Sequence, residues 1–141
     1  MQFWASIKPS LITLLPVANA GWREECSVGG NAQFHIIAGK PYLSTICPSS
    51  AGPVCTMLDL SYCYMNSHGH LASTINGHFE KSCKGCQLTG ANATILSCSC
   101  EMFGKDAPWQ DAEIDLEDLV ENQNGLLTCW NGGQKKCPGQ V

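Results

Sequence analysis

The strongest constraint on this chain is a sequence motif that occurs twice. The first copy runs from Leu58 to Leu71 and the second from Ile114 to Leu127, and both read aliphatic-Asp-Leu-x5-Asn-x2-Gly-x-Leu. A repeat of this length indicates one structural unit used twice, and two units are too few for an open solenoid. We therefore expect the two repeats to pack on each other in a single domain with pseudo-twofold symmetry.

The repeat extends upstream of this motif. Each unit begins with an aromatic-x3-Cys element, which is followed by aliphatic-x-Gly and then by Leu-x3-Cys. The non-cysteine matches are the evidence for the repeat, because chance alone can align cysteines in a Cys-rich chain. They place repeat one at residues 22–75 and repeat two at residues 79–130. The matched positions include Trp22 with Phe79, Gly39 with Gly90, and Leu43 with Leu96.

The first 20 residues have the pattern of a secretory signal peptide. Lys8 is the only charge before Arg23, the run from Leu11 to Val17 is mostly apolar, and Ala18-Asn19-Ala20 has the form of a cleavage site. The apolar run is too short to span a bilayer. We expect a secreted protein with a signal peptide at 1–20, one domain at 21–130 and a C-terminal tail at 131–141.

Charge and cysteine content narrow the class further. A formal net charge of −4 disfavours nucleic acid and anionic membranes as partners, because both require a cationic surface.

All ten cysteines follow the predicted signal, and an even number in a secreted chain indicates disulfides. Zinc is the rival use, since Cys83-x2-Cys86 and Cys98-x-Cys100 resemble a four-thiolate site. The second spacing is one residue too tight for such a site, and we expect no metal and no cofactor.

The repeat selects two disulfide pairs. Cys26–Cys47 and Cys83–Cys100 respect the internal symmetry, and each closes a loop of about 20 residues, worth about 3 kcal/mol in the loop-entropy model. A Cys86–Cys98 bond would lie beside Cys83–Cys100 in a ladder and is favoured next. The sequence leaves open the pairing of Cys55, Cys63, Cys86, Cys98, Cys129 and Cys137.

Turn-forming residues divide the chain into short strands. Strands are predicted at 33–38, 42–47, 71–75, 93–100 and 126–130. Asn124-Gly125 is a strong hairpin signal, because both central residues of a two-residue turn need positive φ, and His68-Gly69 occupies the same place in repeat one. Thr56-x2-Asp59 resembles a capping box, and the acids from Asp115 to Asp118 suit the first turn of a helix. Each repeat therefore reads as a strand pair, a short helical turn and a hairpin.

These ordered elements resemble the cyanovirin-N homology domain. The resemblance spans roughly Trp22 to Trp130 and is strongest in repeat two, where Phe79-x3-Cys83, Leu96-x3-Cys100 and Asn122-x2-Gly125 follow the family's order. It implies an all-β, single elongated domain of two pseudo-symmetric repeats with strand exchange, short helical turns and disulfides. It also implies a non-catalytic lectin for mannose-type glycans.

The family's sugar sites lie near the two ends of the domain. Each combines the Asn-x2-Gly hairpin with residues just before the first Cys and just after Leu-x3-Cys. In the hairpin of repeat one, Met65 and His68 stand where the family has acidic side chains. We therefore expect the site at the Asn122 hairpin to be the functional one. Carried over to this chain, the first carbohydrate site contains Glu25, Ser49, Glu121, Asn122, Gln123 and Asn124, and the second contains Asn66, Ser67, His68 and Ser82.

The asparagines and aspartates of the motif have structural alternatives. For Asn66 and Asn122 the alternative is that the turns themselves require them, since Asn tolerates positive φ and bonds nearby backbone. Asp59 and Asp115 could be read as a carboxylate pair for glycoside hydrolysis, but their place before a helical turn favours capping. No Ser/His/Asp or Cys/His order points to a nucleophile, and we expect no enzyme.

The chain contains two further motifs, a group of histidines and a glycosylation sequon. His68 and His70 would face the same way on a strand end and could bind a metal with His78. A solvated hairpin tip is the better interpretation, because no carboxylate or Cys ligand is adjacent. Asn92-Ala93-Thr94 is an N-glycosylation sequon, which predicts a surface loop at Asn92.

The primary hypothesis is a secreted lectin for mannose-type oligosaccharides or glycoproteins. The alternative is a secreted protein-interaction or effector protein that uses the same scaffold with degenerate sugar sites. Strand exchange between repeats permits either a monomer or a domain-swapped dimer.

Overall fold

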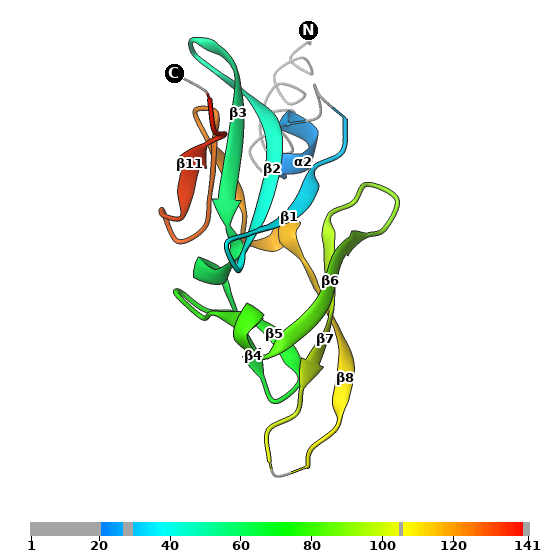
Figure 1. Ribbon diagram of the computed structural model, residues 1–141. Coiled ribbons are helices and arrows are strands. Elements are labelled where there is room, and N and C mark those ends of the chain that lie inside the picture. The colour runs from blue at the N-terminus through cyan, green and yellow to red at the C-terminus, as the bar shows by residue number, and fades with distance from the viewer. Residues whose placement is uncertain (1–20, 27–29, 105, 140–141) are drawn as a thin grey trace, which may run out of the picture.

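The protein is an elongated β domain in which each half has one main sheet and one two-stranded hairpin. The computed structural model describes residues 21–26, 30–104 and 106–139, and the predicted signal peptide lies outside them. One half contains a four-stranded sheet in the order β1-β2-β3-β11, and the other contains a three-stranded sheet, β6-β7-β8 (Figure 1). The strands are β1 (Gln33–Ile37), β2 (Lys40–Ser49), β3 (Gly52–Asp59), β6 (Cys83–Thr89), β7 (Ile95–Glu101), β8 (Trp109–Asp115) and β11 (Gln134–Lys136).

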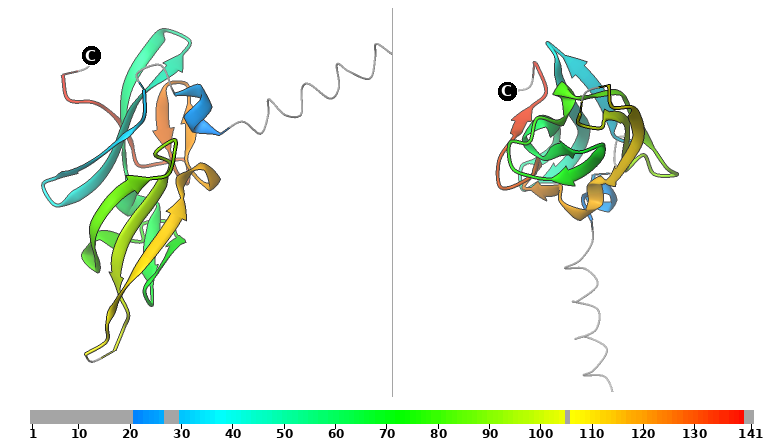
Figure 2. Two further views of the ribbon diagram at one scale, coloured as in Figure 1. Left: turned by 90° about the vertical axis from the view of Figure 1, so that its right-hand side faces the viewer. Right: turned by 90° about the horizontal axis from the view of Figure 1, so that it is seen from below.

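Two hairpins are exchanged between the halves. Hairpin β4 (Tyr64–Ser67) and β5 (His70–Ser73) belongs to repeat one, but β5 packs on β8 of repeat two. Hairpin β9 (Glu121–Gln123) and β10 (Leu126–Thr128) belongs to repeat two, but β10 packs on β3 of repeat one. The views in Figure 2 show the two halves joined in this way. The predicted all-β fold with strand exchange is confirmed, and neither repeat completes a half alone.

Short helical turns connect the sheets to the hairpins. They are α2 (Trp22–Glu25), η2 (Leu60–Tyr62), η3 (Phe79–Lys81) and η4 (Leu116–Asp118). The Asp59 carboxylate accepts a hydrogen bond of 3.0 Å from the Ser61 N–H, and Asp115 accepts one of 2.9 Å from the Glu117 N–H. Both aspartates therefore cap helical turns. None of the described helices is long and apolar enough to cross a bilayer.

A single apolar core draws on both repeats. Its fully buried members include Trp22, Leu43, Leu58, Phe79, Leu96 and Leu127. All ten cysteines are paired, so no thiolate is left for the zinc site considered above. Within the repeats lie Cys26–Cys47, Cys83–Cys100 and Cys86–Cys98. Cys63–Cys129 joins the repeats, and Cys55–Cys137 attaches the segment after β11 to β3.

Thr56 has a different role from the one that its sequence context predicts. It lies inside β3 and caps no helix, so the capping-box interpretation is wrong. Its buried hydroxyl accepts a hydrogen bond of 2.9 Å from the Leu127 N–H of β10 and donates one of 3.4 Å to the Lys135 carbonyl of β11. The hydroxyl therefore joins the exchanged hairpin and the last strand to the first sheet.

We expect Thr56→Val to lower the free energy of unfolding by about 1–3 kcal/mol, because it keeps the shape and leaves a buried N–H unpaired. Guanidinium unfolding with the disulfides intact would measure the loss. Thr89→Val is the matched control, since the Thr89 hydroxyl lies on a partly exposed sheet face where water can replace its partners. Equal losses in the two variants would contradict the assignment.

Tyr64 is a buried side chain with an unpaired hydroxyl. Its ring is fully buried, and its hydroxyl has no hydrogen-bond partner among the described residues. Burial raises the pKa of Tyr64 well above its ordinary value, and the carboxylates of Asp118 and Asp115 add to the increase. The fold therefore favours the protonated phenol. This contribution to stability is complete below about pH 10 and is lost as the pH rises further.

We expect Tyr64→Phe to be neutral or stabilising at pH 7, because it removes an unpaired polar group from the core. Above about pH 10 the parent protein should lose stability relative to the variant by about 1.4 kcal/mol per pH unit. Unfolding curves across this pH range would measure the difference. Tyr62→Phe, at a partly buried ring, serves as the control, and parallel pH profiles for parent and Tyr64→Phe would disprove the prediction.

Candidate functional site

The two predicted sites are organised around equivalent hairpin turns. Asn124 and Gly125 have φ values of 50° and 99°, and His68 and Gly69 have values of 51° and 90°, as a two-residue turn of this hand requires. In both turns the motif asparagine holds the glycine. The Asn122 Oδ1 accepts the Gly125 N–H at 2.7 Å, and the Asn66 Oδ1 accepts the Gly69 N–H at 2.8 Å.

At the first predicted site, the hairpin rests on the turn between β2 and β3. The Asn124 Oδ1 accepts a hydrogen bond of 2.8 Å from the Ser50 N–H, and the Asn122 Nδ2 donates one of 3.4 Å to the Pro48 carbonyl. A methyl group added at Gly125 would come within 2.8 Å of the Ser49 Cβ, which shows how closely the two turns pack. Residues that are 74 positions apart in sequence thus form one end of the molecule.

The outward-facing groups at this end are mainly oxygen acceptors. Glu25, on α2, and Glu121 are exposed, and neither carboxylate makes a hydrogen bond to another described residue. The exposed Gln123 donates its Nε2 to the Asn131 Oδ1 at 2.8 Å, which leaves its amide oxygen for solvent. The Ser49 hydroxyl donates to the Gly52 carbonyl at 2.6 Å and belongs to its own turn. Because α2 also contacts β9, all six predicted residues gather at one end of the molecule.

At the second predicted site, Asn66 is enclosed by the protein. It is only 4% exposed. Its Nδ2 donates to the Ser82 carbonyl at 3.2 Å, to the Ser82 hydroxyl at 2.9 Å and to the Glu101 carbonyl at 2.9 Å. With the Gly69 N–H on its oxygen, every polar atom of Asn66 is used within the fold.

Apolar and aromatic groups lie beside this second turn. The His68 ring meets the Phe103 ring edge-on, with a centroid distance of 5.0 Å. A methyl group added at Gly69 would lie 2.8 Å from the Met102 Cγ, and the Gln110 Nε2 donates to the Gly69 carbonyl at 2.9 Å. Ser67 and His68 remain at the surface. The space beside this turn is occupied by side chains of the protein itself.

The remaining sequence motifs lie elsewhere. Asn92 is exposed in the turn between β6 and β7, where a sequon is accessible. The His78 Nδ1 lies 3.6 Å from the Glu80 Oε2. Among the described residues, no group of three or more His, Cys, Asp or Glu side chains is arranged to hold a metal ion.

Comparison with known families identifies the fold. A family model described as the CVNH domain matches residues 31–128. The chain belongs to the CVNH (cyanovirin-N homology) family. Membership confirms the resemblance on which the expected fold was based. The family is one of non-catalytic lectins, in agreement with the prediction that the chain is not an enzyme.

Solved CVNH structures share the architecture at low sequence identity. The CVNH protein of N. crassa is 18% identical with a TM-score of 0.59, and the alignment covers 71% of this chain and 92% of that chain. The CVNH protein of Gibberella zeae is 20% identical with a TM-score of 0.60, covering 77% and 95%. Microvirin, in complex with mannobiose, is 24% identical with a TM-score of 0.59, covering 77% and 97%. A search of curated protein sequences found no match.

Sequence reasoning missed the supporting residues of both ends. Asn131 orients Gln123 although it lies in the segment assigned to the tail. Gln110, in β8, holds the second turn through the Gly69 carbonyl. Neither residue belongs to the repeated motif, and only the folded chain brings them to the hairpins.

The two motif asparagines should differ in their contribution to stability. We expect Asn66→Ala to lower the free energy of unfolding by about 2–4 kcal/mol, because it leaves several buried groups unpaired, and Asn122→Ala to lower it by about 1 kcal/mol. Chemical denaturation of both variants measures the difference. Similar losses at the two positions would show that the burial of Asn66 has no energetic consequence.

Proposed function

We propose that this protein is a secreted lectin that binds mannose-type oligosaccharides at the end formed by Glu25, Ser49 and residues 121–124. The observation that supports this most is a set of oxygen acceptors without hydrogen bonds to other described residues, namely the Glu25 and Glu121 carboxylates and the Gln123 amide oxygen. Sugar hydroxyls are donors, and a few well-placed polar groups fix their orientation. Microvirin, which shares the fold, has been solved with mannobiose.

The rigidity of this end supports the proposal. The Asn122 and Asn124 side chains fasten the hairpin to the β2–β3 turn, so the groups on β9 are held in place before a ligand arrives. A preorganised surface loses less conformational entropy on binding. Secretion is proposed with it, because five disulfides are typical of an extracellular protein and the first 20 residues resemble a signal peptide. Under secretion, Asn92 is proposed as a glycosylation site.

A titration with mannobiose, followed by amide NMR signals, tests the site. We expect signal changes to cluster at residues 121–124 and 49–50, and Gln123→Ala to weaken binding about tenfold, the effect of losing about 1.4 kcal/mol. Ser67→Ala is the matched control, because Ser67 occupies the position equivalent to Gln123 in the other hairpin. Changes that cluster at the Asn66 hairpin, or no binding by a natively folded protein, would refute the proposal.

The second candidate function, a protein-interaction role, rests on the other end of the molecule. There the Asn66 side chain is fully used by the fold, and Phe103 is 50% exposed beside His68. An exposed aromatic group, next to an asparagine whose polar atoms are already hydrogen-bonded within the protein, suits a protein contact better than a sugar contact. Pull-down of a protein partner that persists in free mannose and is lost in Phe103→Ser would favour this role.

A further inference from the structure

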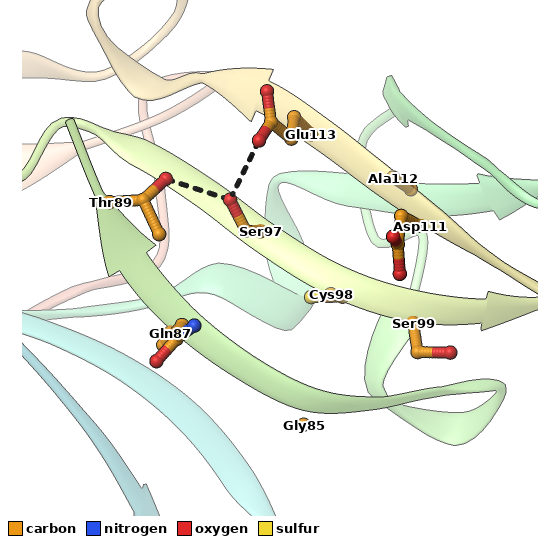
Figure 3. Close-up of a pocket in the computed structure, with 9 residues that line it drawn as sticks. All are labelled: Gly85, Gln87, Thr89, Ser97, Cys98, Ser99, Asp111, Ala112 and Glu113. Atoms are coloured by element: carbon orange, nitrogen blue, oxygen red, sulfur yellow. Dashed lines mark hydrogen bonds between the residues drawn. The ribbon is translucent and has the colours of Figure 1, made fainter.

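The sheet of the second half has a polar hollow on its outer face, away from both hairpin turns. The hollow has a volume of about 320 Å³ and lies over β6, β7 and β8. Figure 3 shows its polar side chains standing on one side of the sheet. These are Gln87, Thr89, Ser97, Ser99, Asp111 and Glu113.

A β-bulge opens this hollow. The register between β6 and β7 shifts between Lys84 and Gln87, and Gly85 in the bulge has a φ of 63° with no atom within 4 Å of where a Cβ would lie. Bulges bend a strand away from its partner and re-aim nearby side chains. The bulge therefore removes side-chain bulk from one wall of the hollow and exposes backbone there.

One row of side chains across the three strands is already organised. The Thr89 and Ser97 hydroxyl oxygens lie 2.8 Å apart, and the Ser97 hydroxyl donates to the Glu113 Oε2 at 3.3 Å (Figure 3). The Thr89 hydroxyl also lies 3.4 Å from the Ile95 carbonyl, to which it can donate. This chain fixes the orientation of the Glu113 carboxylate and leaves its second oxygen for another donor.

The neighbouring row consists of Lys84, Ser99 and Asp111. Ser99 and Asp111 are directly opposite each other in the β7–β8 register. Their side chains, and that of Gln87, make no hydrogen bond to any other described residue. The hollow thus presents a hydroxyl, an amide and two carboxylates within one short stretch of sheet.

The other half of the molecule has a smaller hollow at the equivalent place, with Gln33 and Ser44 in its lining but no carboxylate. The repeat aligns Ser99 with Ile46, Asp111 with Cys55, and Glu113 with Met57. There Cys55 is bonded to Cys137, and β11 pairs with β3 beside Met57. The two carboxylates and the Ser99 hydroxyl are therefore no requirement of the fold, since apolar and disulfide groups take their places in repeat one.

Charge limits what fits the hollow. The side chains that line it include two carboxylates and no cation. Lys84 is opposite Ser99 in the β6–β7 register, but its ammonium is placed over the Trp109 ring, 4.2 Å from the centroid, and it does not line the hollow. A ligand with both hydroxyls and a positive charge matches this set, because hydroxyls suit Ser99 and Gln87 while an ammonium suits the carboxylates.

We propose that the hollow binds a cationic amino sugar, in the form of a β-linked glucosamine oligomer. A pyranose carries hydroxyl donors and acceptors in close succession, as the Ser99, Gln87 and Asp111 side chains do. A basic peptide would satisfy the charge but would leave the hydroxyl and amide groups without equally dense partners. The site is distinct from the proposed mannose site in residues and in location.

The test is an amide NMR titration of the intact disulfide-bonded protein with three probes at about pH 6 and low salt. The probes are a glucosamine tetramer, its fully N-acetylated counterpart and tetralysine. We expect the glucosamine tetramer to move the signals of Gln87, Ser97, Ser99 and Asp111, and to bind at least about tenfold more tightly there than either other probe. Residues 121–124 report separately on mannose binding, so failure of one proposal leaves the other measurable.

Charge-matched variants complete the design. Asp111→Asn should weaken glucosamine binding about tenfold, as expected for loss of a charged hydrogen-bond partner, and Ser99→Ala should weaken it less. Asp118→Asn is the control for net charge, because Asp118 is exposed on η4 outside the hollow. Equal binding of tetralysine, equal binding of the acetylated tetramer, or equal losses in Asp111→Asn and Asp118→Asn would each overturn the proposal.

Discussion

The exchange of two hairpins between repeats is the constraint on which the rest of the structure depends. Each repeat supplies a sheet on which the other repeat's hairpin packs. The buried hydroxyl of Thr56 stabilises the exchanged arrangement, because it accepts the hydrogen bond of the Leu127 N–H. Without this acceptor the buried N–H would be unpaired, which is costly. Cys63–Cys129 adds a covalent bond between repeats. As a result, each end of the molecule joins segments that are distant in sequence.

The two halves share the same arrangement of strands, but the last strand of the main sheet is covered differently in each. In the first half, β11 and Cys137 close the sheet beyond β3. In the second half, β8 is the last strand of its sheet among the described residues, and it carries the exposed acids Asp111, Glu113 and Asp115 beside the exposed Trp109. Charged outward residues discourage strand addition at a sheet edge. The same groups, together with the bulge in β6, form a polar hollow that is larger than the equivalent hollow of repeat one and, unlike it, is lined by carboxylates.

The paired asparagines show how one motif can have two outcomes. In both hairpins the side-chain oxygen holds the turn glycine, so the structural role is common to both. The amide nitrogen meets one long contact to Pro48 in one hairpin and three acceptors in the other. The loops beside the two hairpins differ, and they leave different groups without hydrogen-bond partners among the described residues.

The sequence by itself determined the repeat, the hairpin turns, the helical caps and the symmetric disulfides. These features rest on local physics or on symmetry: positive φ at Asn-Gly and His-Gly, carboxylates next to helical N–H groups, and equivalent cysteines in two units. Only the tertiary structure decided the pairs Cys55–Cys137 and Cys63–Cys129, the pairing of β11 with β3, the burial of Asn66 and the polar hollow. Each of these depends on contacts between segments far apart in the chain, and no local pattern encodes which distant groups will meet.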